Sequence, residues 1–155
     1  MLKAMPKSIR DVKHFSLVLE DFDLRNCIII IDRGFFSMNN IDEMNKKEIR
    51  FIQPLRRNSK IIEYLMIMKE SFVYRDRGIR YGMKRIGKYY LYLYENVKMK
   101  GKEHSNLIEN RSREKRIKID ESRLGKIAIL SNMLRQGIKY TIYTSKGKSQ
   151  SKRLM

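Results

Sequence analysis

The sequence has few of the residues that mark a disulfide-bonded, zinc-binding or membrane-spanning protein. It contains one cysteine, Cys27, and two histidines, His14 and His104. A single cysteine cannot form an internal disulfide, and the two histidines lack zinc-finger spacing. The longest aliphatic run, residues 28–31, is far shorter than the roughly 20 residues that span a bilayer, and no basic-then-apolar signal peptide opens the chain. We therefore expect a cytoplasmic protein with no membrane partner.

Acidic side chains are also scarce. The 155 residues include 35 Lys and Arg against 17 Asp and Glu, a formal net charge of +18. Residues 1–70 hold 13 basic and 10 acidic side chains, whereas residues 71–155 hold 22 and 7. The first half thus has the charge balance of an ordinary folded domain, and the second half is typical of a protein that binds a polyanion.

The first half alternates between helix-like and strand-like patterns. Apolar spacing predicts a helix over residues 9–20 and a second helix that starts at Ser37. The uninterrupted apolar run Cys27–Ile31 predicts a strand in the middle of a sheet, buried on both faces, with Cys27 as a small buried hydrophobe. A further strand is expected over residues 49–54. This order predicts an α/β layered fold with parallel strand pairing.

The pattern changes after about residue 57. Residues 61–68 have the apolar spacing of a short helix, and three aromatic-rich stretches then alternate with turn-like sequences, which predicts antiparallel β-structure. A charged helix, another strand and a poorly ordered basic tail are expected to follow. The expected strands are residues 72–74, 79–86, 89–94 and 126–130, the turns lie at 76–78 and 87–88, the charged helix covers about 102–118, and the tail begins at 134.

Asp32 is the sharpest candidate for chemistry, because it follows directly after the apolar run that ends at Ile31. Sheets in α/β proteins place ligands at such strand ends, where a rigid scaffold holds the side chain and a loop exposes it. On spacing alone, a second interpretation is open as well. Asp-x-Gly is a common turn, so Asp32 could simply begin a turn with Gly34 or cap the following helix.

Three motifs together make the sequence similar to a known family. They are Pro6-x-Ser8-x-x-Asp11, the run IIIIDRGFFS at residues 28–37, and the run FIQPLRRNSK at residues 51–60. In this combination the sequence resembles the DDE transposases. More narrowly, it resembles the transposases of insertion-sequence family four, which carry a β-rich insertion in the catalytic core. The resemblance extends from about residue 6 to residue 133.

The resemblance implies an RNase H-like fold in which three carboxylates hold two divalent metal ions, Mg²⁺ or Mn²⁺. Such a pair activates a water or a DNA 3′-hydroxyl at a phosphodiester. By motif match, Asp32 is the second catalytic carboxylate and a metal ligand. The first would lie on a strand upstream of Ser8. The third belongs to a Tyr-x2-Arg-x3-Glu-x6-Lys pattern that matches from none of the nine tyrosines.

With only one carboxylate assigned, the resemblance implies a chain that is truncated or frame-shifted at both ends. Metal binding by one carboxylate is weak, so we expect weak or absent binding of Mg²⁺ or Mn²⁺ by this fragment and no cleavage of DNA by the chain alone. Asp11 is better explained as a helix-capping residue. Glu103, Glu109 and Glu114 precede the strand at 126–130, whereas the family's Glu follows it, so we expect them to be surface charges of the predicted helix.

The resemblance also implies a division of the chain into four parts. Residues 1–56 would form a partial RNase H-like catalytic core, and residues 57–124 a β-rich insertion plus the charged helix. Residues 125–133 would return to the core as a strand. Residues 134–155 would be a disordered basic tail.

DNA, in the form of transposon ends, is the partner that the resemblance implies, and a homo-oligomer is left open. Basic side chains in two stretches are the candidate phosphate contacts. The first stretch lies near Asp32 if the two N-terminal strands are neighbours. The second is interleaved with tyrosines and suits either a DNA-facing β-surface or a small sheet with a charged outer face and an aromatic core. The candidates are Arg56, Arg57 and Lys60 in the first stretch, and Arg77, Arg80, Lys84 and Arg85 in the second.

Two other interpretations compete with a transposase fragment. A non-catalytic, basic nucleic-acid-binding protein accounts equally well for the charge of +18, but it does not account for the two motifs around Asp32 and residues 54–60. An unstable remnant with an unpaired sheet edge would tend to aggregate.

Overall fold

A computed structural model describes residues 19, 23–24, 26–113 and 120–134 of the chain. The chain divides into two units, one comprising residues 1–53 and 132–155 and the other comprising residues 54–131. Apart from Leu19 and Leu134, the predicted helix over 9–20 and the predicted disordered tail lie outside the described residues. The fold is mixed α/β, as predicted, and is compatible with a partial RNase H-like core.

In the first unit, a helix connects two parallel strands. The elements are β1 (Ile28–Ile30), the short 3₁₀ helix η1 (Arg33–Phe35), α2 (Met38–Lys46) and β2 (Arg50–Pro54). β1 and β2 pair in parallel, with Ile29 opposite Phe51. Parallel neighbours need a crossover connection, which η1 and α2 supply. The predicted helix start is confirmed, because the Ser37 side chain caps α2 by accepting a hydrogen bond from the Asn40 N–H.

β1 is less buried than its sequence predicts. Ile30 is 46% exposed, and Cys27 is exposed as well, although Ile31 is buried. Among the described strands of this unit, β1 pairs with β2 alone, so the apolar run is covered only in part. The prediction of a central strand buried on both faces, with a buried Cys27, is therefore wrong for the described residues.

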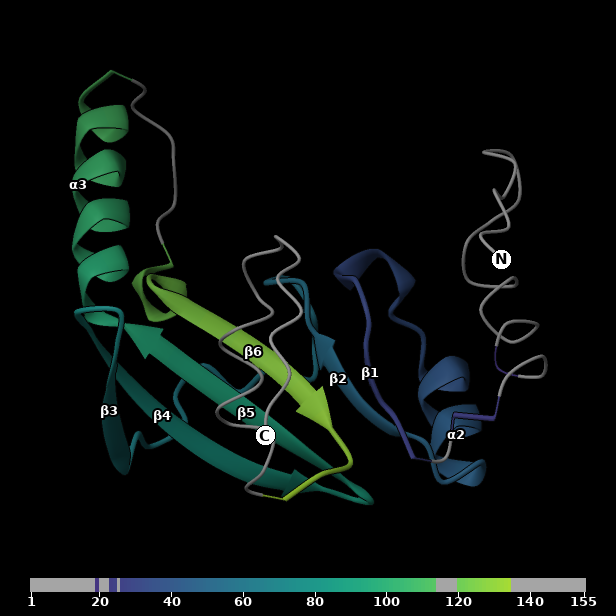
Figure 1. Ribbon diagram of the computed structural model, residues 1–155. Coiled ribbons are helices and arrows are strands. Elements are labelled where there is room, and N and C mark those ends of the chain that lie inside the picture. Colours follow the sequence, from purple (N-terminus) through teal and green to yellow (C-terminus); the bar gives the residue numbers. More distant parts are fainter. Residues whose placement is uncertain (1–18, 20–22, 25, 114–119, 135–155) are drawn as a thin grey trace, which may run out of the picture. The chain divides into compact units, whose positions relative to one another are not determined.

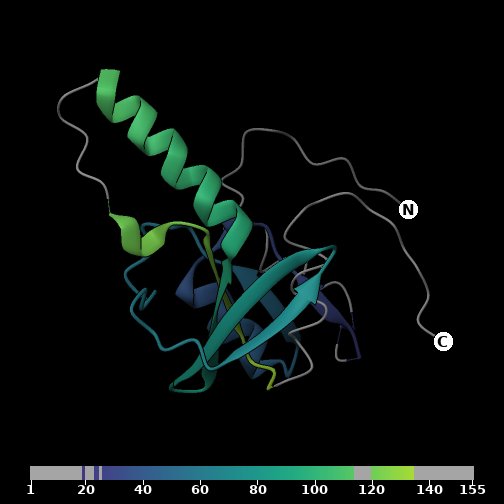
Figure 2. The same cartoon turned by 90° about the vertical axis from the view of Figure 1, so that its left-hand side faces the viewer.

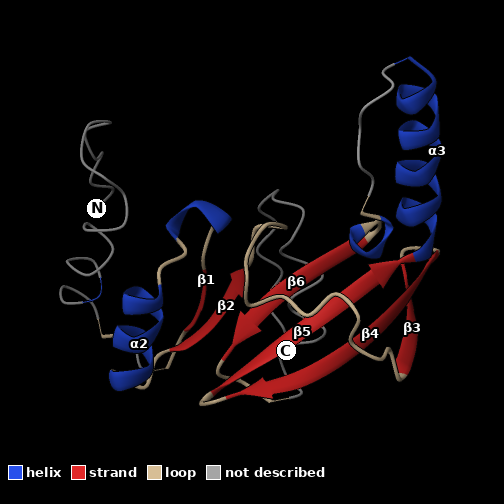
Figure 3. Cartoon of the chain, turned by 180° about the vertical axis from the view of Figure 1, so that it is seen from behind, coloured by secondary structure: helices blue, strands red, loops and turns tan. Residues whose placement is uncertain are grey.

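The second unit is an antiparallel sheet with one long helix at its end (Figures 1 and 3). Its strands lie in the order β3, β4, β5, β6, and each neighbouring pair is antiparallel. The predicted hairpins are thus confirmed. The first turn lies slightly earlier than expected, at Arg75 and Asp76, both of which have positive φ. The elements are β3 (Glu70–Tyr74), β4 (Arg77–Ile86), β5 (Tyr89–Asn96), α3 (Val97–Arg113), η2 (Glu121–Arg123) and β6 (Lys126–Ser131).

Residues 61–69, which we call the strap, do not form the predicted helix. Instead the strap crosses one face of the second unit's sheet. Glu63 forms an ion pair with Lys84 of β4, and the Tyr64 carbonyl accepts a hydrogen bond from the Lys126 ammonium group. A side chain at Gly82 would come within 2.5 Å of the Ile67 carbonyl oxygen, so this glycine makes room for the strap. Contacts with the sheet therefore override the helical spacing of the strap's apolar residues.

The long helix α3 begins five residues before the predicted helix. The Asn96 side chain caps it by accepting a hydrogen bond from the Met99 N–H at 2.9 Å. Gly125 lies beside this first turn with φ at +66°, and its carbonyl accepts a hydrogen bond from the Asn96 N–H. Beyond its first turns α3 extends away from the sheet of its unit (Figure 2).

Candidate metal and nucleic-acid sites

Asp32 lies two residues beyond the end of β1, in a tight turn. Its side chain caps η1, with Oδ1 accepting a hydrogen bond from the Gly34 N–H at 2.8 Å. Its carbonyl oxygen accepts a hydrogen bond from the Gln53 side chain of β2 at 3.1 Å. A Cβ atom at position 34 would lie 3.3 Å from Oδ1, so the glycine lets the turn close tightly. The capping geometry of the second interpretation is therefore present.

The same geometry allows Asp32 to act as one metal ligand, but Asp32 alone does not form a metal site. Its side chain is exposed, and carboxylate oxygens are the ligands that Mg²⁺ and Mn²⁺ prefer. Within residues 19, 23–24, 26–113 and 120–134, no group of three or more His, Cys, Asp and Glu side chains could hold a metal ion. Asp32 fits as one member of a larger ligand set, and its catalytic role stays a prediction.

The basic stretch after β2 belongs to the second unit, whereas Asp32 belongs to the first. Arg56 and Lys60 are exposed, and neither forms an ion pair among the described residues. Arg57 is different, because its guanidinium donates to Glu103 of α3 at 2.7 Å. The expected closeness of this stretch to Asp32 stays a prediction.

The four basic candidates on β4 lie on two faces of the sheet. Side chains alternate along a strand, so Arg77 and Arg85 share one face while Arg80 and Lys84 share the other. Arg80 and Lys84 also have carboxylate partners, namely Glu95 and Glu63. The four residues therefore do not form a single surface on β4, and their DNA-binding roles stay predictions.

The aromatic residues of β5 are mainly core residues. Tyr89, Tyr92 and Tyr94 are buried. The ring of Tyr94 stacks on that of Tyr81 with their centroids 5.9 Å apart, and Tyr81 meets Phe72 edge-on at 5.7 Å. These ring contacts join β3, β4 and β5, as the aromatic-core interpretation predicts for this part of the sheet.

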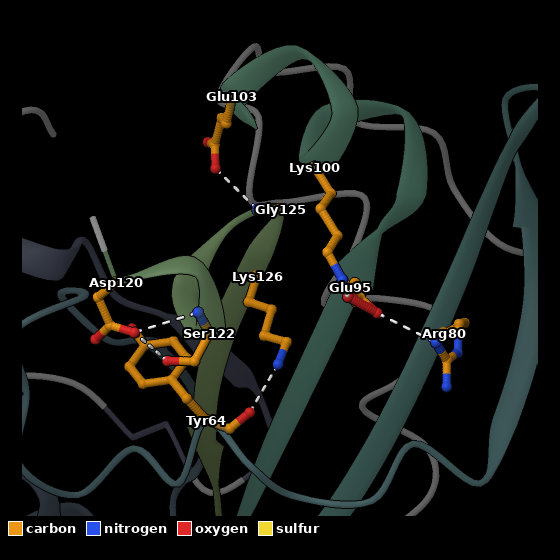
Figure 4. Close-up of polar contacts among 9 residues, drawn as sticks. All are labelled: Tyr64, Arg80, Glu95, Lys100, Glu103, Asp120, Ser122, Gly125 and Lys126. Atoms are coloured by element: carbon orange, nitrogen blue, oxygen red, sulfur yellow. Dashed lines mark hydrogen bonds and ion pairs between the residues drawn. The ribbon is translucent and has the colours of Figure 1, made fainter. Parts of the chain in front are cut away.

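Glu95, which the sequence did not single out, is a buried carboxylate among three cations (Figure 4). It accepts a hydrogen bond from the Lys100 ammonium group of α3 at 2.8 Å and pairs with Arg80 of β4 at 3.5 Å. Lys126 lies opposite Glu95 on β6. Burial lowers the pKa of Lys126, Glu95 opposes this effect, and Lys100 and Arg80 reinforce it. We call Arg80, Lys100 and Lys126, with Glu95 between them, the basic corner.

Glu103 also differs from the prediction of a simple surface charge. It is half-buried, and its two carboxylate oxygens accept hydrogen bonds from the Arg57 guanidinium at 2.7 Å and from the Gly125 N–H at 2.8 Å. Burial alone would raise the pKa of Glu103, but these two hydrogen bonds and the positive charge of Arg57 together outweigh burial and lower the pKa. Glu109 is exposed, as expected, and Glu114 lies outside the described residues.

A shallow groove of about 570 Å³ lies between α3 and η2. Its lining includes His104 and Glu121, and the side chains of these two residues lie 3.9 Å apart. One imidazole and one carboxylate at this distance are too few to hold a metal ion by themselves. The groove therefore adds no site to those already described.

The family of the chain follows from comparison with family models. The model of the transposase DDE domain matches residues 2–151. The chain belongs to the transposase DDE domain family. The match covers more of this DDE chain than residues 6–133, the extent of the resemblance expected from the sequence. No curated protein and no solved structure matches the chain. In the part of this DDE chain that the structure describes, no helix is long and apolar enough to cross a membrane.

Proposed function

We propose that this chain acts on DNA as part of a transposase of the insertion-sequence family four type. The parent activity would be metal-dependent cleavage and transfer of DNA strands at transposon ends. The observation that carries the proposal is the family match over residues 2–151, together with an exposed Asp32 at the end of a strand. A cytoplasmic location would accompany this activity.

In this proposal, Asp32 supplies one ligand to a site for Mg²⁺ or Mn²⁺. The metal, when bound, would activate a water or a DNA 3′-hydroxyl. The hydrogen bond from Gly34 to Oδ1 would fix the direction of the carboxylate. The other two carboxylates of the family have no counterpart among the motifs of this sequence. We therefore expect the chain to bind DNA and not to cleave it by itself.

Basic side chains would supply the phosphate contacts. Four of the seven candidates have no carboxylate partner among the described residues, which leaves their charge available to DNA. The other three form ion pairs with carboxylates of the protein, namely those of Glu103, Glu95 and Glu63. The unpaired four are Arg56, Lys60, Arg77 and Arg85, and the paired three are Arg57, Arg80 and Lys84.

Binding of a labelled DNA duplex at several salt concentrations tests the DNA part of the proposal. If about four phosphates are neutralised, the affinity should fall about tenfold for each doubling of the salt concentration. Fluorescence anisotropy would measure this slope. Salt-insensitive binding, or no binding at low salt, would contradict the proposal.

The nucleotide sequence on both sides of the gene tests the transposase part. Read in all frames, it should encode an upstream strand ending in Asp and a downstream Tyr-x2-Arg-x3-Glu-x6-Lys pattern. If neither appears in any frame, the assignment to this transposase type fails, even if the chain binds DNA.

A further inference from the structure

The geometry points to the basic corner as a phosphate-binding site for the DNA backbone, and we propose that Arg80, Lys100 and Lys126 contact phosphates there. This inference rests on the proposed function, because it names the place where DNA would bind. It adds Lys100 and Lys126 to the candidates from the sequence and gives Glu95 the role of a positioning residue.

The strand register brings the corner together. One row of paired residues crosses the four strands from β3 to β6. Ser71 of β3 pairs with Arg80 of β4, Arg80 pairs with Glu95 of β5, and Glu95 pairs with Lys126 of β6. Directly paired residues point to the same face of an antiparallel sheet, so the four form one polar row. Arg80 and Lys126 lie two strands apart, a distance of about 10 Å. The row is therefore wide enough to follow a nucleic-acid backbone.

The cations of the corner keep donors available for a ligand. The described contacts of Lys100 and Lys126 each use one of three ammonium N–H groups, on Glu95 and on the Tyr64 carbonyl. The described contact of Arg80 uses one of its two terminal nitrogens. The side chains of Arg80 and Lys100 are 54% and 47% exposed, so phosphate oxygens can reach them.

Glu95 organises this charge without blocking it. Its side chain is only 5% exposed, so an approaching anion meets the cations and not the carboxylate. With one carboxylate among three basic side chains, the corner keeps a formal excess of two positive charges. A buried carboxylate is stable only with such partners, so Glu95 holds Arg80 and Lys100 in place before any ligand binds.

The start of α3 is held firmly, which fixes the position of Lys100. Asn96 caps the helix, and Gly125 packs against it so closely that a Cβ atom at position 125 would lie 2.6 Å from the Lys100 Cβ. Glu103, one turn further along, binds the Gly125 N–H. A preorganised set of donors binds a phosphate with less loss of side-chain entropy than three free lysines would.

Two sets of variants of the full chain separate local from overall charge. The corner variant combines Arg80→Gln, Lys100→Gln and Glu95→Gln, which lowers the formal net charge by one and removes the buried carboxylate together with its two ion-pair partners. The control combines Lys98→Gln and Lys102→Gln, which lowers the charge by two. Lys98 and Lys102 are exposed, and each lies about 200° around the helix axis from Lys100. Thermal melting would check that both variants fold.

Binding of a labelled DNA duplex is then measured against salt. For the corner variant, the slope of log affinity against log salt should fall by about two, and the affinity at low salt should fall about tenfold or more. The control should stay within about threefold of the wild type. If the corner variant does not fold, Lys100→Gln is compared with Lys102→Gln, and the slope should fall by about one for Lys100→Gln alone.

The outcomes distinguish this inference from the proposed function. Suppose that the wild-type chain binds the duplex. If the corner and control variants then lose affinity equally, or the corner variant loses none, the corner site is overturned while the proposal of DNA binding stands. No binding by the wild-type chain overturns both. A loss confined to the corner variant supports both.

Discussion

Two regions of the molecule use a carboxylate in opposite ways. In the Asp32 turn, the carboxylate is exposed and accepts a hydrogen bond from a backbone N–H. In the basic corner, the carboxylate of Glu95 is buried and touches two cationic side chains. Because the Asp32 carboxylate is exposed, its desolvation costs little free energy in the folded chain, and it leaves an oxygen for a ligand. The Glu95 arrangement is stable only while its partners remain.

The difference indicates how each region serves a DNA-binding protein. A metal ligand must be reachable and must not be neutralised by a resident lysine or arginine, which suits Asp32. A positioning carboxylate must be fixed and shielded, which suits Glu95. Substitutions in the basic corner should therefore affect stability strongly, whereas substitutions in the Asp32 turn should affect it weakly.

The largest difference is expected between two glycine substitutions. Gly125→Ala should lower the free energy of unfolding by about 3 kcal/mol, because φ is +66° and the new Cβ would lie 2.6 Å from Lys100 and 2.8 Å from the Asn96 carbonyl oxygen. Gly34→Ala should lower it by less than about 1 kcal/mol, because the nearest atom is the side-chain oxygen of Asp32 at 3.3 Å. Urea unfolding would measure both, and equal effects would contradict the comparison.

Removal of the buried carboxylate should have the next largest effect. Glu95→Ala should destabilise the chain by about 2 kcal/mol, because it leaves Lys100 and Arg80 without their shared anion. The value is below that of a fully buried pair because both cations are about half exposed. Glu95→Gln keeps the shape and should recover part of the loss. A stability like that of the wild type for Glu95→Ala would mean that Glu95 does not organise the corner.

Glu103 should make stability depend on pH. Its pKa is lower in the folded chain than its ordinary value of 4.5, so its stabilisation is full above that value and is lost as the pH falls through the folded pKa. Glu103→Gln should therefore cost up to about 1 kcal/mol at pH 7, because the partner Arg57 is 45% exposed, and less at pH 3. Unfolding curves at pH 7, 5, 4 and 3 would measure this difference, and a constant difference would rule out Glu103 as the cause.

The smallest effect on stability is expected for Asp32→Asn. Asparagine keeps the oxygen that accepts the hydrogen bond from Gly34, so the loss should be below about 0.5 kcal/mol. Asp32→Ala removes the cap and should cost about 1 kcal/mol. A large loss for Asp32→Asn would show that the charge itself supports the fold, contrary to a carboxylate kept free for a ligand.

Local patterns in the sequence predicted most of the regular elements. Ser37 predicted the start of α2, and the alternating aromatic stretches with their turn residues predicted β3, β4 and β5. The strap was predicted wrongly, because its apolar residues have helical spacing while its conformation depends on contacts with Gly82 and Lys84. Such contacts join residues far apart in the chain, and no local pattern contains them.

The candidate site could be predicted only in part. Asp32 was found because a motif and a strand end coincide at one position, and its place after β1 agrees with that reasoning. The basic corner was missed because it depends on the register of three strand pairs and on the direction of α3. Counting outward from the Gly87 turn pairs Arg80 with Glu95, so that single contact could have been predicted from the hairpin.

The most direct test of the central claim measures whether Mn²⁺ strengthens DNA binding through Asp32. Duplex binding by the wild-type chain is compared in EDTA, in Mn²⁺ and in Ca²⁺ with that of Asp32→Asn, whose capping hydrogen bond and fold should be intact. We predict that Mn²⁺ raises the affinity of the wild-type chain about fivefold over EDTA and leaves that of Asp32→Asn unchanged. Equal responses of the two proteins to Mn²⁺ would contradict the claim that Asp32 is a metal ligand.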